Sequence, residues 1–390
     1  MKVIKGGKVL VAKGEIIENG TVVIEDGKIL DVGVGIEAPA GAEVIDAKGC
    51  WVTPGLIDVH THLMGFPSVG TMPGLNGDFN EVSDPITPHI RAIDALDPFD
   101  IGVERARMAG FTTCYTGPGS ANIIGGLGCA VKLRGRTAEE MFIEGTEQMK
   151  FALGENPKRV YGHSNRAPVT RMAVAGMLRE ALTKARAYAE DYRKFEAGGG
   201  EKPKFDAKCH SLMGVVEGTV RCRIHCHRAD DIMTAIRIGR EFGLDFTLEH
   251  ATEGWRIADI IARENVVCVV GPFTIGPLKQ EVWNSTHKTP AIYEKAGVEI
   301  CLTADAGFGT QYLPVYVGML MRYGLSEKTA FMSVTETPAR VMGLQGRIGS
   351  IEKGKDADIA VFDGHPFSNM TKCRLTIIDG EVFENTLFDK

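Results

Sequence analysis

The chain has 390 residues and a formal net charge of −6, a length that fits one large α/β barrel with a modest appendage, since such barrels often take about 250 residues. Acidic and basic residues are interspersed, no apolar run approaches the ~20 residues of a membrane span, and the first residues lack a secretory apolar stretch. We therefore expect a cytoplasmic protein that binds neither nucleic acid nor a membrane. As partners we expect a small-molecule substrate and further copies of the same chain in a homo-oligomer.

Short strands are expected at both ends of the chain. Apolar runs separated by Gly, Asn and Asp turn signals occupy residues 9–11, 21–24, 28–32, 357–362 and 375–380. We predict that residues 1–52 and 346–390 pair into one small composite β-sandwich, which flanks a barrel domain of residues 53–345.

The middle of the chain alternates short apolar runs with amphipathic stretches. The runs occupy residues 110–115, 148–153, 222–225, 246–248, 266–270 and 298–302. Strand and helix repeated this often predict a parallel sheet with helices outside, and the length favours a closed (β/α)8 TIM-like barrel over a doubly wound sheet. A helix from about Val169 to Phe195 is longer than one barrel helix needs, so we expect part of it to lie over the barrel mouth.

The strongest motif is the apolar strand Val52–His62, which ends in His60-Thr61-His62. Side chains two residues apart on a strand point to the same face, so both histidines can reach one ion inside a barrel. Two histidines alone are as readily explained by packing or by hydrogen bonds in a loop. The partners that follow favour a metal site.

Those partners come where other apolar runs end. His225-Cys226-His227 closes one run, His250 closes the next, and Asp305 follows a third. Barrel enzymes place their catalytic groups at such strand ends. The other histidines, in loop-like polar contexts, are His89, His163, His210, His287 and His365. They are expected at the surface, although His163 follows a strand that should open on the same face.

The segment Pro54–His62 resembles the signature of the amidohydrolase superfamily. The whole pattern resembles its branch of imidazolonepropionase-like enzymes, enamidase and metal-dependent Xaa-Pro dipeptidases, and Gly346–Ile359 is similar to the start of that family's C-terminal strands. The resemblance covers almost the whole chain. It implies a hydrolase that attacks an amide or cyclic amide bond with a metal-bridging hydroxide.

The resemblance also implies roles for single residues. His60 and His62 correspond to ligands of the more buried metal, and His250 to a ligand of the second. Asp305 corresponds to the aspartate of the eighth strand, a metal ligand that takes a proton from the attacking hydroxide and passes it to the leaving nitrogen. A peptide oxyanion hole is then not needed, because a metal polarises the carbonyl.

The fifth-strand ligand lies within residues 225–227. His227 is preferred, because His227-Arg228-Ala229-Asp230 resembles the His-x-x-acid pattern of relatives. His225, two residues deeper on the same face, would then be a second metal contact or a substrate contact.

Two-metal members of the superfamily bridge their metals with a carboxylated lysine on the fourth strand. Lys150 is the candidate, because a lysine in the middle of a short apolar strand is costly as a cation. The alternatives are that Lys150 snorkels outward and that Lys132 is the bridge. We expect two divalent ions per chain, zinc foremost, although such ligands also accept Mn, Fe or Co.

Two further features of the sequence bear on the substrate site. Gly117–Gly119 and Gly125–Gly128 match no phosphate-loop spacing and predict a loop above the barrel mouth. Arg166 and Arg171 offer bidentate donors for a substrate carboxylate, although exposed arginines are common at the start of a helix.

Two other functions remain open. A mononuclear deaminase or cyclic-imidate hydrolase on this fold lacks the bridging lysine and has a glutamate where this chain has Asp230. A non-catalytic assembly protein of the same fold has typically lost ligands, whereas every ligand type is present here.

Overall fold

A computed structural model describes residues 1–68, 77–273, 279–305 and 309–385. Within these residues the strands form two sheets of eight, one built from both ends of the chain and one from its middle. Among the described residues, no helix combines the length and the apolarity needed to cross a membrane.

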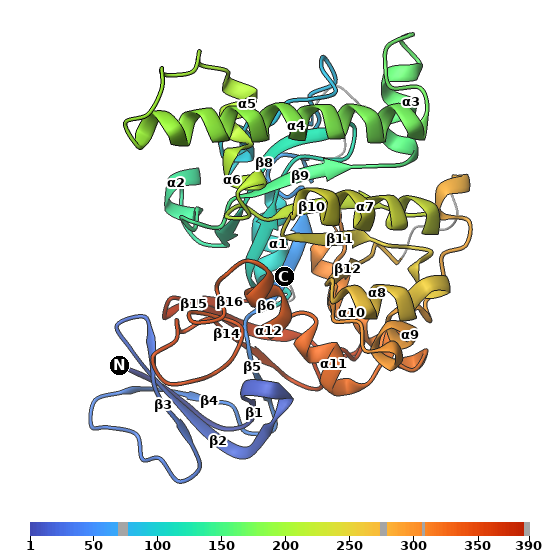
Figure 1. The fold of residues 1–390 in the computed structure, drawn as a ribbon. Helices are drawn as coiled ribbons and strands as arrows, with labels where there is room; N and C mark the ends of the chain where they lie inside the picture. Colours follow the sequence, from blue (N-terminus) through green and yellow to red (C-terminus); the bar gives the residue numbers. More distant parts are fainter. Residues whose placement is uncertain (69–76, 274–278, 306–308, 386–390) are drawn as a thin grey trace.

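The first sheet, here called the terminal sheet, combines the N- and C-terminal segments. Its strands are β1 Lys2–Leu10, β2 Ile16–Glu25, β3 Lys28–Gly33, β4 Glu43–Asp46, β5 Trp51–Pro54, β14 Ile359–Phe362, β15 Cys373–Ile378 and β16 Glu381–Glu384. Their order is β16-β15-β14-β5-β1-β2-β3, with β4 paired to β1, and β14 joins the two segments by pairing antiparallel with β5 (Figure 1). The predicted union of the two ends is confirmed, and the two-layer form of a sandwich stays a prediction.

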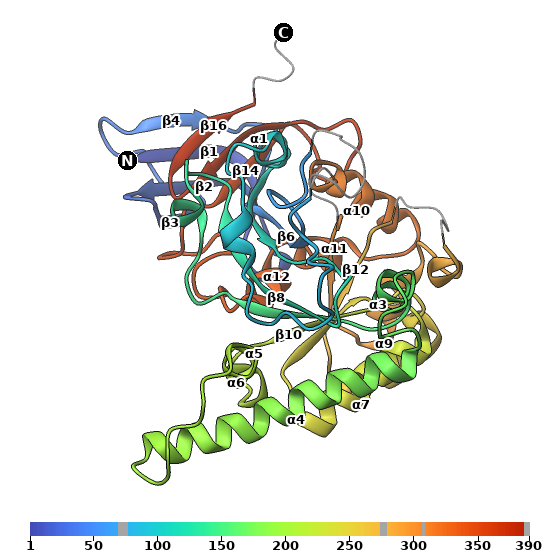
Figure 2. The ribbon, with the colours of Figure 1, turned by 90° about the horizontal axis from the view of Figure 1, so that it is seen from above.

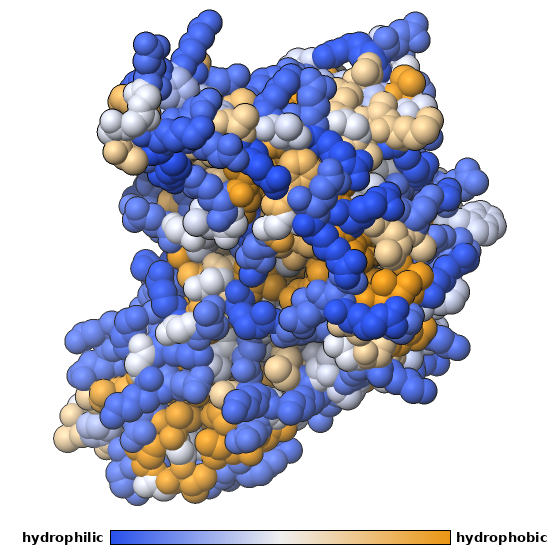
Figure 3. All heavy atoms as spheres, viewed as in Figure 1, coloured by the Kyte–Doolittle hydropathy of each residue, from blue (hydrophilic) through white to orange (hydrophobic). Residues whose placement is uncertain are grey.

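Alternating side chains give the terminal sheet a buried face. Ile4, Val22 and Ile24 pack with Ile359 and Ile377 in a cluster separate from the barrel core. On the opposite face of the C-terminal strands, Phe362, Cys373 and Ile378 pack into the barrel core. Figure 3 shows hydrophobic residues at the surface over the terminal sheet.

The second sheet is the barrel. Its strands are β6 Leu56–Thr61, β7 Phe111–Thr116, β8 Ile124–Lys132, β9 Gln148–Ala152, β10 Cys222–Cys226, β11 Phe246–His250, β12 Cys268–Val270 and β13 Ile300–Leu302. They follow one another in chain order across the sheet. The Thr303 hydroxyl, just past β13, lies 2.7 Å from the Asp58 carboxylate and 2.6 Å from the His60 carbonyl of β6, and it can donate to either, so the barrel is nearly closed.

One strand departs from the predicted parallel arrangement. β8 runs antiparallel to both β7 and β9, whereas the other neighbours in the barrel are parallel. The predicted loop at Gly125–Gly128 is therefore wrong, because these residues lie in β8. Gly126 has φ +110°, and a Cβ there would lie 2.5 Å from the Ile90 carbonyl oxygen, so glycine permits this close approach. Gly117–Gly119 does lie outside the strands, and Gly119 lines the cavity described below.

Helices cover the outside of the barrel. The α-helices are α1 Ile101–Met108, α2 Ala138–Met141, α3 Glu155–Gly162, α4 Arg171–Glu196, α5 Ala207–Ser211, α6 Met213–Val216, α7 Ala229–Phe242, α8 Ala258–Glu264, α9 Thr289–Ala296, α10 Leu313–Arg322, α11 Glu327–Met332 and α12 Glu336–Val341. Short 3-10 turns are η1 Ala12–Gly14, η2 Ala92–Ala95, η3 Gly254–Ile257, η4 Gln280–Val282 and η5 Thr310–Tyr312.

The long helix α4 begins with Thr170 as its N-cap and packs along the outside of the barrel. Its apolar stripe of Val174, Leu178, Leu182 and Ala185 is buried in the main core. The C-terminal half of α4 runs past the barrel to α5 and α6, which lead into the start of β10 (Figure 2). The expectation that this helix lies over the barrel mouth is wrong, because its extra length lies beside the beginning of a strand.

Candidate active site

The carboxyl ends of five barrel strands bring the predicted site residues together. His60 lies on β6, Lys150 on β9, His225 on β10 and His250 on β11. His62 and His227 follow directly after β6 and β10, and Asp305 lies a short way past the end of β13 at Leu302. Six of the seven line one cavity of about 520 Å³: His62, Lys150, His225, His227, His250 and Asp305. His60 lies buried beside them.

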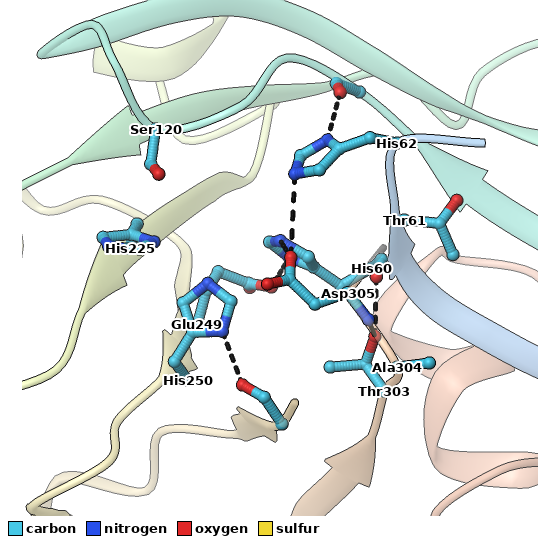
Figure 4. A network of polar contacts seen from close by, with 12 residues as sticks. His60, Thr61, His62, Ser120, His225, Glu249, His250, Thr303, Ala304 and Asp305 are labelled. Carbon is cyan, nitrogen blue, oxygen red and sulfur yellow. Dashed lines mark hydrogen bonds and ion pairs between the residues drawn. The ribbon is translucent and has the colours of Figure 1, made fainter. Parts of the chain in front are cut away.

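His60, His62 and Asp305 form the tightest group (Figure 4). Asp305 Oδ1 lies 3.4 Å from His60 Nε2 and 3.6 Å from His62 Nε2. The ligand atoms of all three lie within 4.8 Å of one another. Asp305 has φ +67°, an uncommon conformation for a side chain other than glycine, and its amide donates to Thr303 Oγ1. The backbone is thus held in a form that turns the carboxylate toward the histidines.

His62 and His250 present their Nε2 atoms to the cavity because their Nδ1 atoms form hydrogen bonds. Nδ1 of His62 donates to the Gly117 carbonyl (2.8 Å), and Nδ1 of His250 donates to the Gly271 carbonyl (2.7 Å). A carbonyl only accepts, so each Nε2 keeps a free lone pair. Burial lowers the pKa of His62 to about 3 and that of His250 to about 4, which keeps both rings neutral. Neutral imidazole is the form that binds metal.

Both candidate ligands of the fifth barrel strand reach the site. The rings of His225 and His227 lie 4.5 and 5.0 Å, centroid to centroid, from that of His250. Nδ1 of His227 contacts Thr252 Oγ1 (2.7 Å), and Nε2 of His225 contacts the Asn156 amide (3.3 Å). Nδ1 of His225 is buried and has no hydrogen-bond partner among the described residues. Such an orphaned nitrogen fits a missing ligand.

Lys150 and Lys132 have different surroundings. Lys150 points into the barrel, with Nζ 3.4 Å from His60 Nε2, and its burial excludes the outward snorkelling alternative. Lys132 Nζ pairs with Asp356, Asp358 and Asp379 at 2.9, 2.9 and 2.6 Å. The alternative that Lys132 bridges the metals is therefore wrong. Because β8 is reversed, its carboxyl end lies at the far end of the barrel from the histidines.

A buried ion pair beneath the histidines was not predicted from the sequence. Glu249 accepts a hydrogen bond from His60 Nδ1 and pairs with Arg223 at 3.3 Å. Arg223 lies over the Tyr115 ring, 4.1 Å from its centroid. The available signal was that Glu249 and Arg223 are charged residues at inward positions of apolar strands, one of them adjacent to His250.

The arginine clamp that the sequence left open does not form at the cavity. Arg171 pairs with Asp231 and Glu281, and Arg166 donates to backbone carbonyls of Val82 and Ser83. Neither arginine is among the described residues that line the cavity. The cations that do line its outer wall are Arg159 and Lys279, which sequence reasoning missed. His163, at the end of α3, is exposed.

Comparison with known proteins gives the family. The profile of the amidohydrolase family matches residues 293–383. Amidohydrolase tasK from Hapsidospora irregularis is 30% identical over 378 residues, which are 89% of this chain, although the chain spans only 38% of that relative. Imidazolonepropionase from Maricaulis maris is 25% identical over 89% of this chain and 88% of its own length.

A solved structure is more similar still. The crystal structure of an amidohydrolase from Thermotoga maritima matches with a TM-score of 0.93 and 37% identity, over 98% of this chain and 100% of that one. The eight-stranded barrel, with histidines clustered at the carboxyl ends of its strands, has the architecture of a barrel hydrolase. The chain belongs to the amidohydrolase family, and it is an enzyme, a hydrolase of carbon–nitrogen bonds. Divalent metals are typical of this family, and the group of His60, His62 and Asp305 fits one.

Proposed function

We propose that the enzyme hydrolyses an amide or cyclic amide bond of a small molecule at a centre of two divalent metals, zinc foremost. The observation that carries this proposal is the convergence of imidazoles and the Asp305 carboxylate at the carboxyl end of the barrel. A metal bound there lowers the pKa of water from ~15.7 towards ~7 and polarises a carbonyl oxygen. The side chains of the cavity must then hold the substrate and move its proton.

The donor set fits two ions. His60, His62 and Asp305 would hold one, and His250 with a histidine of β10 would hold the other. The sequence pattern favours His227 as the β10 ligand. The buried Nδ1 of His225, which has no hydrogen-bond partner within the described part of the chain, favours His225. On the second assignment, His227, whose Nδ1 is engaged by Thr252, faces the substrate.

Lys150 would supply the bridge as a carbamate. Burial lowers its pKa to about 8, so a sizeable share of the amine is neutral near that pH. A neutral amine adds to carbon dioxide and loses a proton, which turns a costly buried cation into an anionic oxygen ligand. A lysine in this place supports the two-metal centre over the mononuclear deaminase or cyclic-imidate hydrolase. Asp230 also supports the two-metal centre over the deaminase, because it is exposed and paired with Arg228.

Asp305 would act as general base and then as general acid. Although burial raises the pKa of Asp305, the neighbouring His250 and His60 hold it well below its usual range, so the carboxylate is ionised and can accept a proton. It would take this proton from the attacking water and return it to the leaving nitrogen. The intact set of ligand side chains speaks against a non-catalytic assembly protein.

A screen of metal-reconstituted enzyme tests the proposal. The metal-free protein is loaded separately with zinc, manganese, iron or cobalt and assayed on N-acyl amino acids, Xaa-Pro dipeptides and cyclic amides. We expect hydrolysis that depends on the metal and about two bound ions per chain. One ion per chain with release of ammonia would instead identify a deaminase, and bound metal with no turnover on the panel would favour the assembly protein.

A further inference from the structure

The outer wall of the cavity carries two cations and one carboxylate. Lys279 Nζ lies 3.1 Å from Glu155 Oε2, and Arg159 Nε lies 2.5 Å from Glu155 Oε1. One carboxylate therefore serves both cations, and this wall has an excess positive charge. Although burial raises the pKa of Glu155, Lys279 and Arg159 hold it below its ordinary value. Glu155 is therefore ionised, and its one negative charge offsets only one of the two positive charges.

This cationic wall is linked to the histidines through Asn156. Lys279 Nζ donates to Asn156 Oδ1 at 2.7 Å, and the Asn156 amide nitrogen lies 2.8 Å from Ser120 Oγ and 3.3 Å from His225 Nε2. One side chain thus separates the Lys279 ammonium from the imidazole group. A ligand that fills the cavity can reach both, as a small substrate would.

The remaining walls define the rest of the ligand. Phe79, Pro272 and Val282 supply apolar surface to the same cavity. A cavity of about 520 Å³ has the size of a small-molecule site. A partly buried ammonium binds a carboxylate more strongly than an exposed one does, because less solvent screens the pair.

We propose that the enzyme selects amides that carry a carboxylate, and that Lys279, assisted by Arg159, binds this carboxylate. The proposal rests on the proposed hydrolysis and names its substrate class. Lys279 is a specificity-determining residue, held in place by Asn156 and Glu155. An apolar group next to the carboxylate contacts Phe79 and Val282, while the scissile bond lies towards His250 and Asp305.

The test uses pairs of amides that differ only in the carboxylate. N-acetyl-leucine is compared with N-(3-methylbutyl)acetamide, and N-acetyl-phenylalanine with N-(2-phenylethyl)acetamide. Turnover is measured with the zinc-loaded enzyme, and binding of each compound is measured by calorimetry. The variants are Lys279→Met, which removes the charge at nearly constant length, and Lys279→Arg, which keeps it. The exposed Lys288→Met, outside the cavity lining, is the matched control.

We expect Lys279→Met to weaken binding of the carboxylates about 10- to 100-fold, the usual range for loss of a hydrogen bond to a charged group. Binding of the neutral partners should change less than about threefold, and metal content should not change. Lys279→Arg should recover part of the preference, and Lys288→Met should behave as wild type. Arg159→Met should give a smaller loss, because Arg159 is more exposed than Lys279.

The two proposals fail in different ways. Turnover without a preference for the carboxylates, or an equal loss for both members of a pair in Lys279→Met, would overturn the carboxylate site and leave the hydrolysis standing. Lys279-dependent binding of carboxylates without turnover would support the site and count against the hydrolysis of these amides. No binding of either member of any pair would overturn the carboxylate site, whatever the turnover of other compounds.

Discussion

Lys132 and Lys150 are buried lysines on adjacent barrel strands, and their surroundings differ completely. Although burial lowers the pKa of Lys132, Asp358 and Asp379 raise it above its ordinary value, so this lysine remains a cation. Lys150 lies beside His60, and burial lowers its pKa to about 8. At the end of the barrel that carries Lys132, carboxylates balance the charge of the ammonium group. At the end that carries Lys150, the Nε2 lone pairs of the histidines and the Lys150 amine are available to react.

The difference separates a structural cluster from a reactive one. At Lys132, charges on β8 are matched by carboxylates of the C-terminal segment, which ties the terminal sheet to the barrel. At Lys150, imidazoles kept neutral by burial surround a cavity. Removing a residue from the first cluster should therefore change stability, and removing one from the second should change metal binding and rate.

The largest effect is expected from His60→Ala or His62→Ala. Each variant removes an imidazole from the group that approaches Asp305 within 3.6 Å, so metal and activity should be lost together. Metal content by elemental analysis and turnover are measured on the same sample. A variant that kept full metal and full turnover would contradict the ligand assignment.

Asp305→Asn keeps the shape of the side chain and removes the base. The chemical step should fall by roughly 10²–10⁴, the range for general acid–base catalysis, while substrate binding changes much less. If Asp305 were only a cap at the end of its strand, asparagine would replace it with a stability change of about 1 kcal/mol at most. Turnover, metal content and melting temperature of this one variant distinguish the two roles.

The two lysines can be compared directly by alanine substitution. Lys150→Ala should bind fewer than two metals per chain, and acetate or propionate should restore part of the activity by filling the bridge. Lys132→Ala should keep its metal but lose about 3–5 kcal/mol of stability, because the buried Asp358 loses the cation it pairs with. Asp356 would keep Lys28 and Arg347, and Asp379 would keep Arg134. Metal loss from Lys132→Ala, with Lys150→Ala unaffected, would reverse the comparison.

Sequence patterns predicted the residues whose position depends on strand alternation. His60 and His62 share a face because they are two residues apart, and the strand ends place His225, His250 and Asp305 with them. The terminal strands were found for the same reason, since turn signals bound them.

The parts that were missed depend on pairing between distant segments. The reversed strand β8 is stabilised by antiparallel pairing with β7 and β9, whereas the local pattern of its glycines predicts a loop. Lys279 and Glu155 meet across 124 residues of chain, and nothing in either local pattern indicates the contact. Glu249 pairs with His60 across 189 residues. Such contacts follow from the closed barrel, which no short motif contains.

Glu249→Gln tests how far metal binding depends on the buried hydrogen bond between Glu249 and His60. Glu249 accepts the Nδ1 proton of His60 and so keeps His60 Nε2 directed to the metal group. Loss of a partner of this kind typically weakens metal binding about 10- to 100-fold. Competition with a chelator measures the affinity. Thr247→Val, which removes only a hydroxyl contact to the same carboxylate, serves as the control, and an affinity equal to wild type in Glu249→Gln would show that His60 needs no such partner.

The smallest effect is expected from lowering the pH, which should change stability at the end of the barrel that carries Lys132. Although burial raises the pKa of Asp356, Lys28 and Lys132 lower it from 3.8 to about 2. A carboxyl whose pKa is lower in the folded state stabilises the fold above its unfolded pKa and loses this contribution as the pH falls through the folded pKa. The contribution should thus be complete at neutral pH and disappear between about pH 4 and pH 2, and it amounts to at most about 2 kcal/mol.

Asp358, whose pKa burial raises, acts in the opposite direction, so the measurement must isolate Asp356. Urea unfolding of wild type and Asp356→Asn from pH 7 to pH 3 does so, because every other carboxyl titrates in both proteins. The stability difference should narrow as the pH falls below 4, and a difference that stays constant over this range would show that the Lys132 cluster does not hold Asp356 in its ionised form.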